Sequence, residues 1–248
     1  MNLGKSLVID NKKNIPEHIL MIPDGNRRWA RERGLYASFG HYTSATDERI
    51  MELFLECKRE GVKYLSFWGF STENWKRDNK EIKSIFNLIL KKIDNLKKEA
   101  HKHHIRFRHI GRKDRLPKNL MKKLNSLESE TEDYQDLNVQ LMLDYGGRDE
   151  IVRAVNKMLK SKVKKVNEET FSQYLDSADI PDPDLIIRTS GEKRTSGAMP
   201  YQAAYAELYF TEDYFPEFGA EELKKAIKSF SSRIRRFGGT ARQDLKKI

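Results

Sequence analysis

The chain has 248 residues, of which 38% are hydrophobic and 34% are charged, and its formal net charge is +10. This length allows a sizeable buried core, and the positive charge indicates anionic partners, either nucleic acid, phosphorylated small molecules or an acidic membrane surface. The single Cys57 excludes an internal disulfide, and no apolar run is long enough for a signal peptide or a spanning helix. We therefore expect a cytoplasmic protein that is soluble or only peripheral to membranes.

The first predicted strand ends near Ile22 and leads directly into a short polar stretch. Asp24 and Gly25 follow, and then Arg27 and Arg28. Ligands of open α/β sheets bind beyond the carboxyl ends of strands, where glycine lets the backbone approach a ligand and arginine donates charge-assisted hydrogen bonds. The stretch suits a phosphate and its metal, and the alternative is an ordinary strand-to-helix turn with solvated arginines.

Helical and strand patterns alternate along the rest of the chain. The predicted strands are 64–70, 104–111, 138–145, 184–189 and 206–210, and the predicted helices are 43–60, about 22 residues from 79, 117–133, 151–159, 170–175 and 220–236. This alternation predicts an α/β fold with an open, mostly parallel six-stranded sheet covered by helices. We expect one domain over 18–240, a flexible leader over 1–17 and a tail over 241–248.

The longest predicted helix begins at a capping box formed by Asp78 and Glu81. Its apolar residues recur at helical spacing and include Phe86, Ile89 and Leu90. This apolar face either packs in the core or also lines a long hydrophobic cavity.

One tetrapeptide occurs twice after the fifth predicted strand, as Arg188 to Gly191 and as Arg194 to Gly197. Arginine guanidinium groups match phosphate oxygens in pairs, so two arginines and the accompanying hydroxyl groups favour a cradle for a second diphosphate. The alternative is a basic surface loop with accidental internal similarity.

Glu207 starts the next apolar strand, where an unpaired carboxylate would be costly. A magnesium ion shared with Asp24 and with substrate phosphates would satisfy it, and so would one of the arginines. His101, His103 and His104 have no cysteine nearby, and we do not expect them to bind metal. Lys91, Lys92, Lys97 and Lys98 indicate a solvated helix face rather than a nucleic-acid site.

Motifs for nucleotide binding, serine hydrolysis and zinc proteolysis are missing, since the chain has no Walker A, G-x-G-x-x-G, G-x-S-x-G or H-E-x-x-H sequence. Five other motifs occur in order. They are His18 to Ala30 with Asp-Gly-Asn-x-Arg-Trp, Phe70 to Arg77 with Ser-x-Glu-Asn-Trp, Tyr145 to Arg148, Asp184 to Phe210 with Arg-Thr-Ser-Gly-Glu, and Arg235 to Gly239. With these motifs the chain closely resembles the cis-prenyltransferases, the family of undecaprenyl diphosphate synthase, from about residue 18 to 240.

The resemblance implies an enzyme that condenses isopentenyl diphosphate with an allylic prenyl diphosphate, forms a Z-polyprenyl diphosphate and releases pyrophosphate. It implies Mg²⁺ as cofactor and a homodimer in which Arg236 and Gly238 reach the partner's active site. The implied catalytic residues are Asp24, Asn26, Ser71 and Asn74; the implied substrate-binding residues are Gly25, Asn26, Arg27, Arg28, Trp29, His41, Ser71, Glu73, Trp75, Arg77, Arg188, Arg194, Ser196, Arg236 and Gly238; the metal ligands are Asp24 and Glu207. Phe86, Ile89, Leu90 and Met142 are the expected tunnel residues.

The chain departs from the family pattern at several positions. Ala37 stands where an arginine is common, and Asp144 stands where asparagine is usual. Further departures are Pro23 for methionine, Lys193 for histidine, Tyr201 for tryptophan, and the altered loop over 197–200. These changes allow two alternatives, prenyl transfer to a different acceptor or with non-standard regiochemistry, and a noncatalytic subunit of a prenyltransferase. Peripheral contact with a membrane is also compatible with the sequence.

Overall fold

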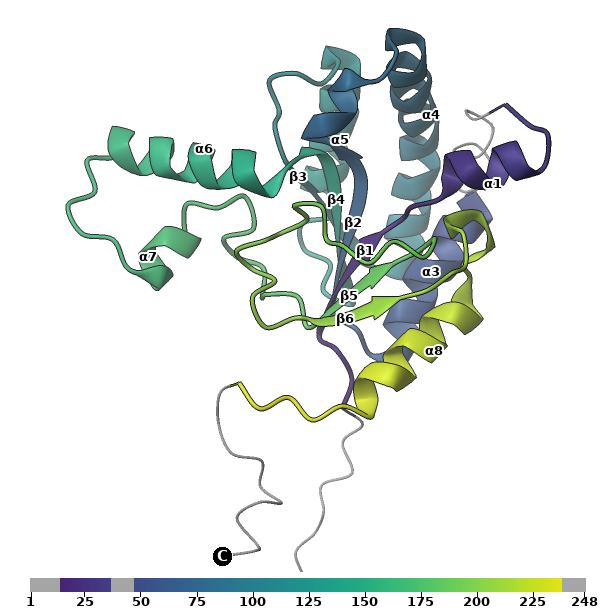
Figure 1. The fold of residues 1–248 in the computed structure, drawn as a ribbon. Helices are drawn as coiled ribbons and strands as arrows, with labels where there is room; N and C mark the ends of the chain where they lie inside the picture. The colour runs from purple at the N-terminus through teal and green to yellow at the C-terminus, as the bar shows by residue number, and fades with distance from the viewer. Residues whose placement is uncertain (1–13, 37–46, 238–248) are drawn as a thin grey trace, which may run out of the picture.

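The computed structural model describes residues 14–36 and 47–237, and six parallel strands in this part of the chain form one sheet (Figure 1). The strand order is β3-β4-β2-β1-β5-β6. The strands are β1 (His18–Ile22), β2 (Tyr64–Ser71), β3 (Ile105–Ile110), β4 (Leu137–Tyr145), β5 (Leu185–Arg188) and β6 (Glu207–Phe210). The predicted open parallel α/β sheet is confirmed.

Helices connect the strands in the predicted alternation. They are α1 (Asn26–Glu32), α3 (Asp47–Glu60), α4 (Asn79–His103), α5 (Lys118–Glu130), α6 (Gly147–Lys160), α7 (Glu168–Ser172) and α8 (Ala220–Ser231), with the short 3-10 helices η1 (Thr72–Lys76) and η2 (Phe215–Glu217). Asp78 caps α4 by accepting a hydrogen bond of 2.8 Å from the Lys80 N–H. Glu81 does not complete the predicted capping box, because its carboxylate accepts a hydrogen bond of 3.1 Å from Arg77 instead.

The larger part of the core lies on one face of the sheet, under α3, α4, α5 and α8. Phe54 from α3 meets Phe67 from β2 and Phe107 from β3, with ring centroids 6.2 and 6.0 Å apart. Buried leucines of α5 and α8 extend the same cluster. Because this face is packed between helices and strands, it supplies the rigid wall on which a site can be built.

A smaller cluster lies on the opposite face, where residues of the 180–206 segment cover the sheet. Met142 belongs to this second cluster, together with Ile180 and Met199. Side chains alternate between the faces of a strand, so Met142 points away from the face to which Leu141 and Leu143 point. The expectation that Met142 lines a tunnel with residues of the long helix is therefore wrong.

Helix α6 has an exposed apolar side. Glu150, Ala154 and Met158 form its buried side, whereas Val152, Val155 and Leu159 are 59%, 43% and 70% exposed. Figure 1 shows α6 and α7 extending to the side of the fold away from α3, α4 and α8. No helix in the described ranges is both long and apolar enough to span a membrane.

Part of the expected leader packs against the fold. Pro16 is buried, Ile15 contacts the core, and the Glu17 N–H donates a hydrogen bond of 2.8 Å to Asp184. The rest of the leader, the tail, Ala37, His41 and Gly238 lie outside the described residues.

Candidate active site

The carboxyl ends of β1 and β5 bring Asp24 and Arg188 together. Ile22 of β1 is paired with Arg188 of β5, so the residues that follow β1 meet the end of its neighbour. The Asp24 N–H donates a hydrogen bond of 2.8 Å to the Thr189 hydroxyl, which donates one of 2.7 Å to the Asp24 carbonyl oxygen. Arg188 Nη2 donates to Asp24 Oδ2 at 2.8 Å. The parallel register thus joins the two motifs that the sequence analysis singled out.

Gly25 is required by both its backbone conformation and its surroundings. Its φ is +94°, a left-handed value that favours glycine. A Cβ at this position would lie 2.5 Å from Tyr214 Cδ1 and 2.7 Å from Ser190 Cβ. The Gly25 N–H donates a hydrogen bond of 2.7 Å to Asp24 Oδ1. This turn fixes the carboxylate of Asp24 directly before α1.

Each of the neighbouring arginines contacts a carboxylate. Arg28 Nη1 lies 2.9 Å from Glu192 Oε1, Arg77 Nη1 lies 3.1 Å from Glu81 Oε1, and Arg27 Nη1 lies 3.9 Å from Glu81 Oε2. Burial lowers the pKa of Arg77 from its usual value, while the nearby Glu81 raises it. Arginine stays protonated in proteins, and its guanidinium group binds phosphate in the same way as carboxylate. The guanidinium groups of these arginines can therefore bind phosphate oxygens in place of the carboxylate oxygens that they contact now.

Arg188 is buried and organises the loop that carries the second tetrapeptide. Its Nη1 donates hydrogen bonds of 2.6 Å to the Arg194 carbonyl oxygen and 2.8 Å to the Ser196 hydroxyl. The Arg194 side chain is 58% exposed and pairs with Glu192. The structure thus brings Arg188 and Ser196 together at the site, but it does not bring the Arg194 side chain there.

Ser71 and Asn74 reach the same site from the end of β2. The Ser71 N–H donates a hydrogen bond of 3.0 Å to Asn74 Oδ1, and this contact closes the capping box of η1. Because η1 starts where β2 ends, both side chains lie at the edge of the sheet where β1 and β5 end.

These residues border a cavity of about 570 Å³. Its polar lining includes Asp24, Asn26, Arg27, Arg28, Ser71, Asn74, Arg77, Arg188 and Ser196, and its apolar lining includes Ile50, Phe54, Phe67, Ile85, Leu88, Ile89, Leu96, Leu141, Leu143 and Phe215. One cavity with both linings fits a molecule that joins an anionic headgroup to a hydrocarbon chain.

Several predicted site residues do not line the cavity. The Trp29 indole N–H donates a hydrogen bond of 2.9 Å to Glu217 in η2. Glu73 is exposed and accepts a hydrogen bond from Thr72, and Trp75 packs against Phe70 and Phe86. Arg236 is exposed and is not among the lining residues.

The long helix lines the cavity with a different set of residues from the predicted one. Ile89 is part of the lining, as predicted, whereas Phe86 packs in the core and the partly buried Leu90 packs against it. Lys92 is half-exposed and lines the cavity together with Ile85 and Ile89, a position that the prediction of a solvated helix face did not include. The helical spacing of Ile85, Ile89 and Lys92 is the signal that could have identified this lysine. Arg31, one turn after Arg27 on α1, is a second lining residue that the sequence analysis missed.

Asp24 and Asn26 fit a magnesium ion. The Asp24 side chain is 32% exposed at the cavity, and Asn26 Oδ1 is buried without a hydrogen-bond partner. Mg²⁺ prefers such oxygen ligands, takes few from the protein and completes its shell with substrate phosphates and water. The described residues contain no cluster of three or more His, Cys, Asp or Glu side chains that could hold a metal.

Glu207 lies at the other end of the sheet. Glu207 is paired with Leu185, the first residue of β5. Asp24 instead follows β1, whose last residue is paired with Arg188, the last residue of β5. Glu207 is thus level with Ile19 of β1, five residues before Asp24, and at about 3.3 Å per residue the two positions are roughly 16 Å apart along the strand direction. Glu207 Oε2 lies 2.8 Å from Arg233 Nη1. The expectation that one ion joins Asp24 and Glu207 is therefore not met within this chain. Glu207 does pair with an arginine, but that arginine is Arg233 and not one from the 188–197 loop.

The sequence is similar to known proteins over most of its length. Residues 22–238 match the family model described as "Putative undecaprenyl diphosphate synthase". The isoprenyl transferase of Fusobacterium nucleatum is 47% identical over 229 residues, which cover 92% of this chain and 98% of that protein. The isoprenyl transferase of Aquifex aeolicus is 45% identical over 225 residues, which cover 90% and 96%.

Two solved structures are also similar. Lavandulyl diphosphate synthase from Lavandula x intermedia, solved in complex with dimethylallyl diphosphate, has a TM-score of 0.86 and 31% identity, with 91% of this chain and 99% of that chain covered. A probable undecaprenyl diphosphate synthase from Campylobacter jejuni has a TM-score of 0.76 and 35% identity, with 90% and 98% covered. The chain therefore belongs to the undecaprenyl diphosphate synthase family and is a cis-prenyltransferase.

Proposed function

We propose that the cavity binds an allylic prenyl diphosphate and isopentenyl diphosphate side by side and joins them into a Z-polyprenyl diphosphate. The observation that carries this proposal is the single cavity with a polar lining at the carboxyl ends of β1 and β5 and an apolar lining from α3, α4 and β4. Holding both reactants in one cavity replaces a bimolecular encounter with an oriented reaction.

The reaction exchanges one bond for another. The bond between the allylic C1 and its diphosphate oxygen breaks, and its electron pair leaves with the pyrophosphate. The double bond of isopentenyl diphosphate supplies the electrons for the new carbon–carbon bond to that C1. Loss of a proton from the isopentenyl C2 then forms the new cis double bond.

Residues around β1 hold the allylic diphosphate in this proposal. Asp24 and Asn26 hold Mg²⁺, while Gly25, Arg27 and Arg28 contact the phosphate oxygens. Charge builds on the departing pyrophosphate, and cationic groups that are already in place stabilise that charge. The bound Mg²⁺ supplies further charge neutralisation on the phosphate oxygens.

Residues after β5 and β2 hold the second substrate. Arg188 and Ser196 bind the diphosphate of isopentenyl diphosphate, and Ser71, Asn74 and Arg77 orient the substrates and support removal of the proton. Support comes from the hydrogen bond of 2.8 Å between Arg188 and Ser196 and from the position of all five side chains on the cavity wall. Arg194 would join them only after its side chain leaves Glu192.

A homodimer is part of the proposal. Val152, Val155 and Leu159 form an exposed apolar strip on α6, and Tyr205, Leu208, Ile234 and Phe237 are exposed near the β6 edge of the sheet. Several exposed apolar side chains on one element favour an interface, and we propose that a second subunit covers them. A second subunit covering it would also bring the segment around Arg236 close to another chain. Light scattering should give the mass of a dimer, and Val155→Lys combined with Leu159→Lys should shift it to that of a monomer.

The enzyme works in the cytoplasm in this proposal, and its apolar product gives a reason for peripheral contact with a membrane surface. The net charge of +10 favours an anionic surface. Co-sedimentation with anionic and with neutral vesicles, followed after turnover, measures this contact.

Product analysis tests the proposed reaction. The enzyme is incubated with Mg²⁺, isopentenyl diphosphate and either farnesyl or geranylgeranyl diphosphate, and the products are resolved by chain length. Elongated products with new Z double bonds are expected, and their absence with every allylic donor would refute the proposal.

A second candidate reaction uses a non-standard bond between the substrates. It is motivated by Ala37 and by the altered loop over 197–200, where the chain departs from the family pattern. Mass spectrometry and NMR of the product decide between the two, because a branched product and a linear Z product differ in the position of the new carbon–carbon bond.

A further inference from the structure

Asp144 occupies an irregular position at the end of β4. The pairing of β2 with β4 joins Phe70 to Leu143 and Ser71 to Tyr145, so Asp144 is left out of the register. Its φ is +51°, a left-handed value that aspartate and asparagine tolerate better than most residues. A bulge of this kind redirects side chains. Leu143 packs in the larger cluster and Tyr145 in the smaller one across the sheet, although residues two apart in a regular strand share a face.

The redirected Asp144 carboxylate is fully buried and is shared by two side chains. Oδ1 accepts a hydrogen bond of 2.8 Å from the Trp75 indole N–H. Oδ2 accepts one of 2.8 Å from Arg115 Nε, and Arg115 Nη2 also bonds to Oδ1. The Arg115 guanidinium lies 5.5 Å from the centroid of the Trp75 ring, within the range of a cation–π contact. Asp144 therefore binds the N–H at the edge of the Trp75 indole, and Arg115 contacts the face of the same ring.

Trp75 connects this pair to the active site. It belongs to η1, between Asn74 and the residues that lead to Arg77. The indole does not line the cavity, but its ring packs against Phe70 and Phe86 at centroid distances of 5.5 Å each. Fixing Trp75 thus fixes a short helix whose neighbouring side chains do line the cavity.

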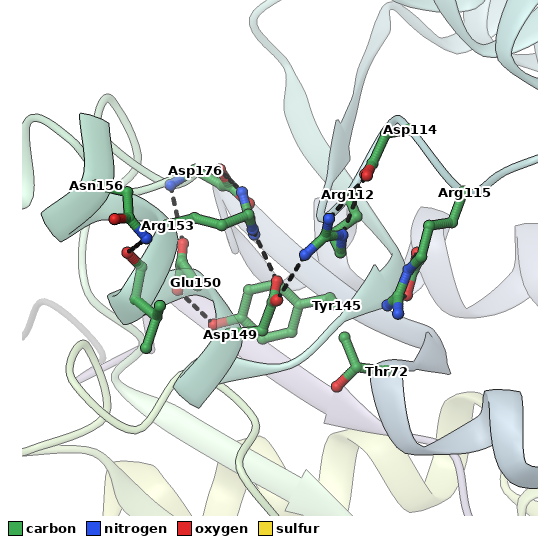
Figure 2. A network of polar contacts seen from close by, with 12 residues as sticks. Thr72, Arg112, Asp114, Arg115, Tyr145, Asp149, Glu150, Arg153, Asn156 and Asp176 are labelled. Atoms are coloured by element: carbon green, nitrogen blue, oxygen red, sulfur yellow. Dashed lines mark hydrogen bonds and ion pairs between the residues drawn. The ribbon is translucent and has the colours of Figure 1, made fainter. Parts of the chain in front are cut away.

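The end of β4 also contacts η1 at a second point. A Cβ on Gly146 would lie 2.1 Å from Thr72 Oγ1, so only glycine allows this close approach. Figure 2 shows Arg112 joined to Asp149 and Tyr145 joined to Glu150, with Thr72 and Arg115 nearby. The Arg112 N–H donates a hydrogen bond of 3.0 Å to the Asp144 carbonyl oxygen, and Arg112 Nη1 lies 2.9 Å from Asp149 Oδ1. The backbone of the bulge is thereby anchored independently of η1.

We propose that Asp144 and Arg115 are positioning residues for the prenyl transfer, which hold Trp75 and through it place Ser71, Asn74 and Arg77 against the reacting carbons. The inference rests on the proposed function of those three residues. The carboxylate at position 144 is matched to Arg115, because asparagine could still accept the indole N–H but would leave the guanidinium without a charged partner.

Kinetics of Asp144→Asn, Arg115→Gln, Trp75→Phe and their pairwise combinations test the proposal. Arg115→Gln should lower kcat by about ten- to a hundredfold, because small misplacements of reacting groups are costly. The KM for the allylic diphosphate should stay nearly unchanged, since Asp24, Arg27 and Arg28 bind it from other elements. Asp144→Asn with Arg115→Gln should restore part of the kcat that Arg115→Gln alone loses, because the pair removes the unmatched carboxylate. Asp144→Asn and Trp75→Phe should be non-additive in kcat, because both variants act on the placement of the ring at position 75, the first by releasing Arg115 from that ring and the second by replacing the ring.

Glu56→Gln is the matched control. Glu56 is also almost fully buried, at 3% exposure, and contacts two cations, Arg59 at 2.9 Å and Lys224 at 3.4 Å, but it lies on α3 away from η1. This variant should lower the melting temperature without lowering kcat. The variants of Asp144 and Arg115 could instead behave like Glu56→Gln, with a lower melting temperature and an unchanged kcat. That result would show a purely structural role for the two residues and would overturn the proposal. If Arg115→Gln does not fold, the cycle between Asp144→Asn and Trp75→Phe decides alone, with additivity counting against the proposal. An inactive wild type would instead refute the proposed function.

Discussion

The two ends of the β1 and β5 pair carry similar charges but have different surroundings. At the carboxyl end, Asp24 and Arg188 pair at 2.8 Å on the wall of a cavity. At the amino end, Asp184 pairs with Arg235, and its Oδ2 accepts hydrogen bonds of 2.8 and 3.2 Å from the Glu17 and His18 N–H groups. The first pair borders space for a ligand, whereas the second ties three chain segments together. An ion pair alone therefore does not identify a site, and the cavity beside it does.

The largest expected effect is on Asp24 at the carboxyl end. Asp24→Asn keeps the size of the side chain but removes the charge that would hold Mg²⁺, so turnover should fall by about a thousandfold or more. The melting temperature should change little, because the Asp24 side chain is partly exposed. Steady-state kinetics over a range of Mg²⁺ concentrations measures the first quantity and thermal unfolding the second. Unchanged turnover would remove Asp24 from the catalytic site.

The second expected effect is a dependence of stability on pH, which comes from His18 at the amino end of the strand pair. His18 is buried, with Nδ1 at 2.6 Å from the Pro181 carbonyl oxygen and Nε2 at 2.9 Å from the Ser66 hydroxyl. Burial lowers the pKa of His18 to about 4. The folded protein therefore binds this proton less readily than the unfolded chain, whose histidine titrates near 6.5.

It follows that the stabilisation from neutral His18 is complete above about pH 6.5 and is lost as the pH falls toward 4. The loss should amount to roughly 3 kcal/mol in the free energy of unfolding. Denaturant unfolding at a series of pH values measures it. His18→Gln should make the fall over this range smaller, with the rest coming from His109, whose pKa burial also lowers. His101→Gln, at an exposed histidine, should leave the curve unchanged. A wild-type curve that does not fall between these pH values would contradict the assignment.

Asp184→Asn is the counterpart of Asp24→Asn, because it removes the charge of the aspartate at the amino end of the strand pair. It weakens the pairing with Arg235 and the contacts to the Glu17 and His18 N–H groups, so the free energy of unfolding should fall by about 1–3 kcal/mol. Because Asp184 does not line the cavity, the kcat of the folded enzyme should stay close to that of the wild type. A large loss of kcat without loss of stability would reverse the comparison between the two ends.

Sequence patterns predicted the local elements and the residues at strand ends. Asp24 and Arg188 could be placed together because apolar runs ended just before or at them, and parallel strands end at one edge of a sheet. Glu207 was misplaced because the register of β6 against β5, which a pattern does not reveal, puts it at the opposite edge. Strand alternation could have assigned Met142 to the face away from Leu141. The bulge at Asp144 could not be read from the sequence, since it depends on how two strands pair.

The smallest effect on rate is expected from substitutions at two adjacent residues of α4. They test whether the apolar lining of the cavity holds the hydrocarbon chain. Both residues are partly buried against the core, but only Ile89 lines the cavity, and Leu90 does not. Ile89→Trp should place a larger ring in the space for the growing chain, so the product distribution should shift to shorter prenyl diphosphates while the first condensation proceeds at nearly the wild-type rate. Leu90→Trp is the matched control: overpacking of the core should lower the melting temperature and leave product length unchanged. If both variants shorten the product equally, the effect comes from core distortion, and the assignment of the cavity to the hydrocarbon chain fails.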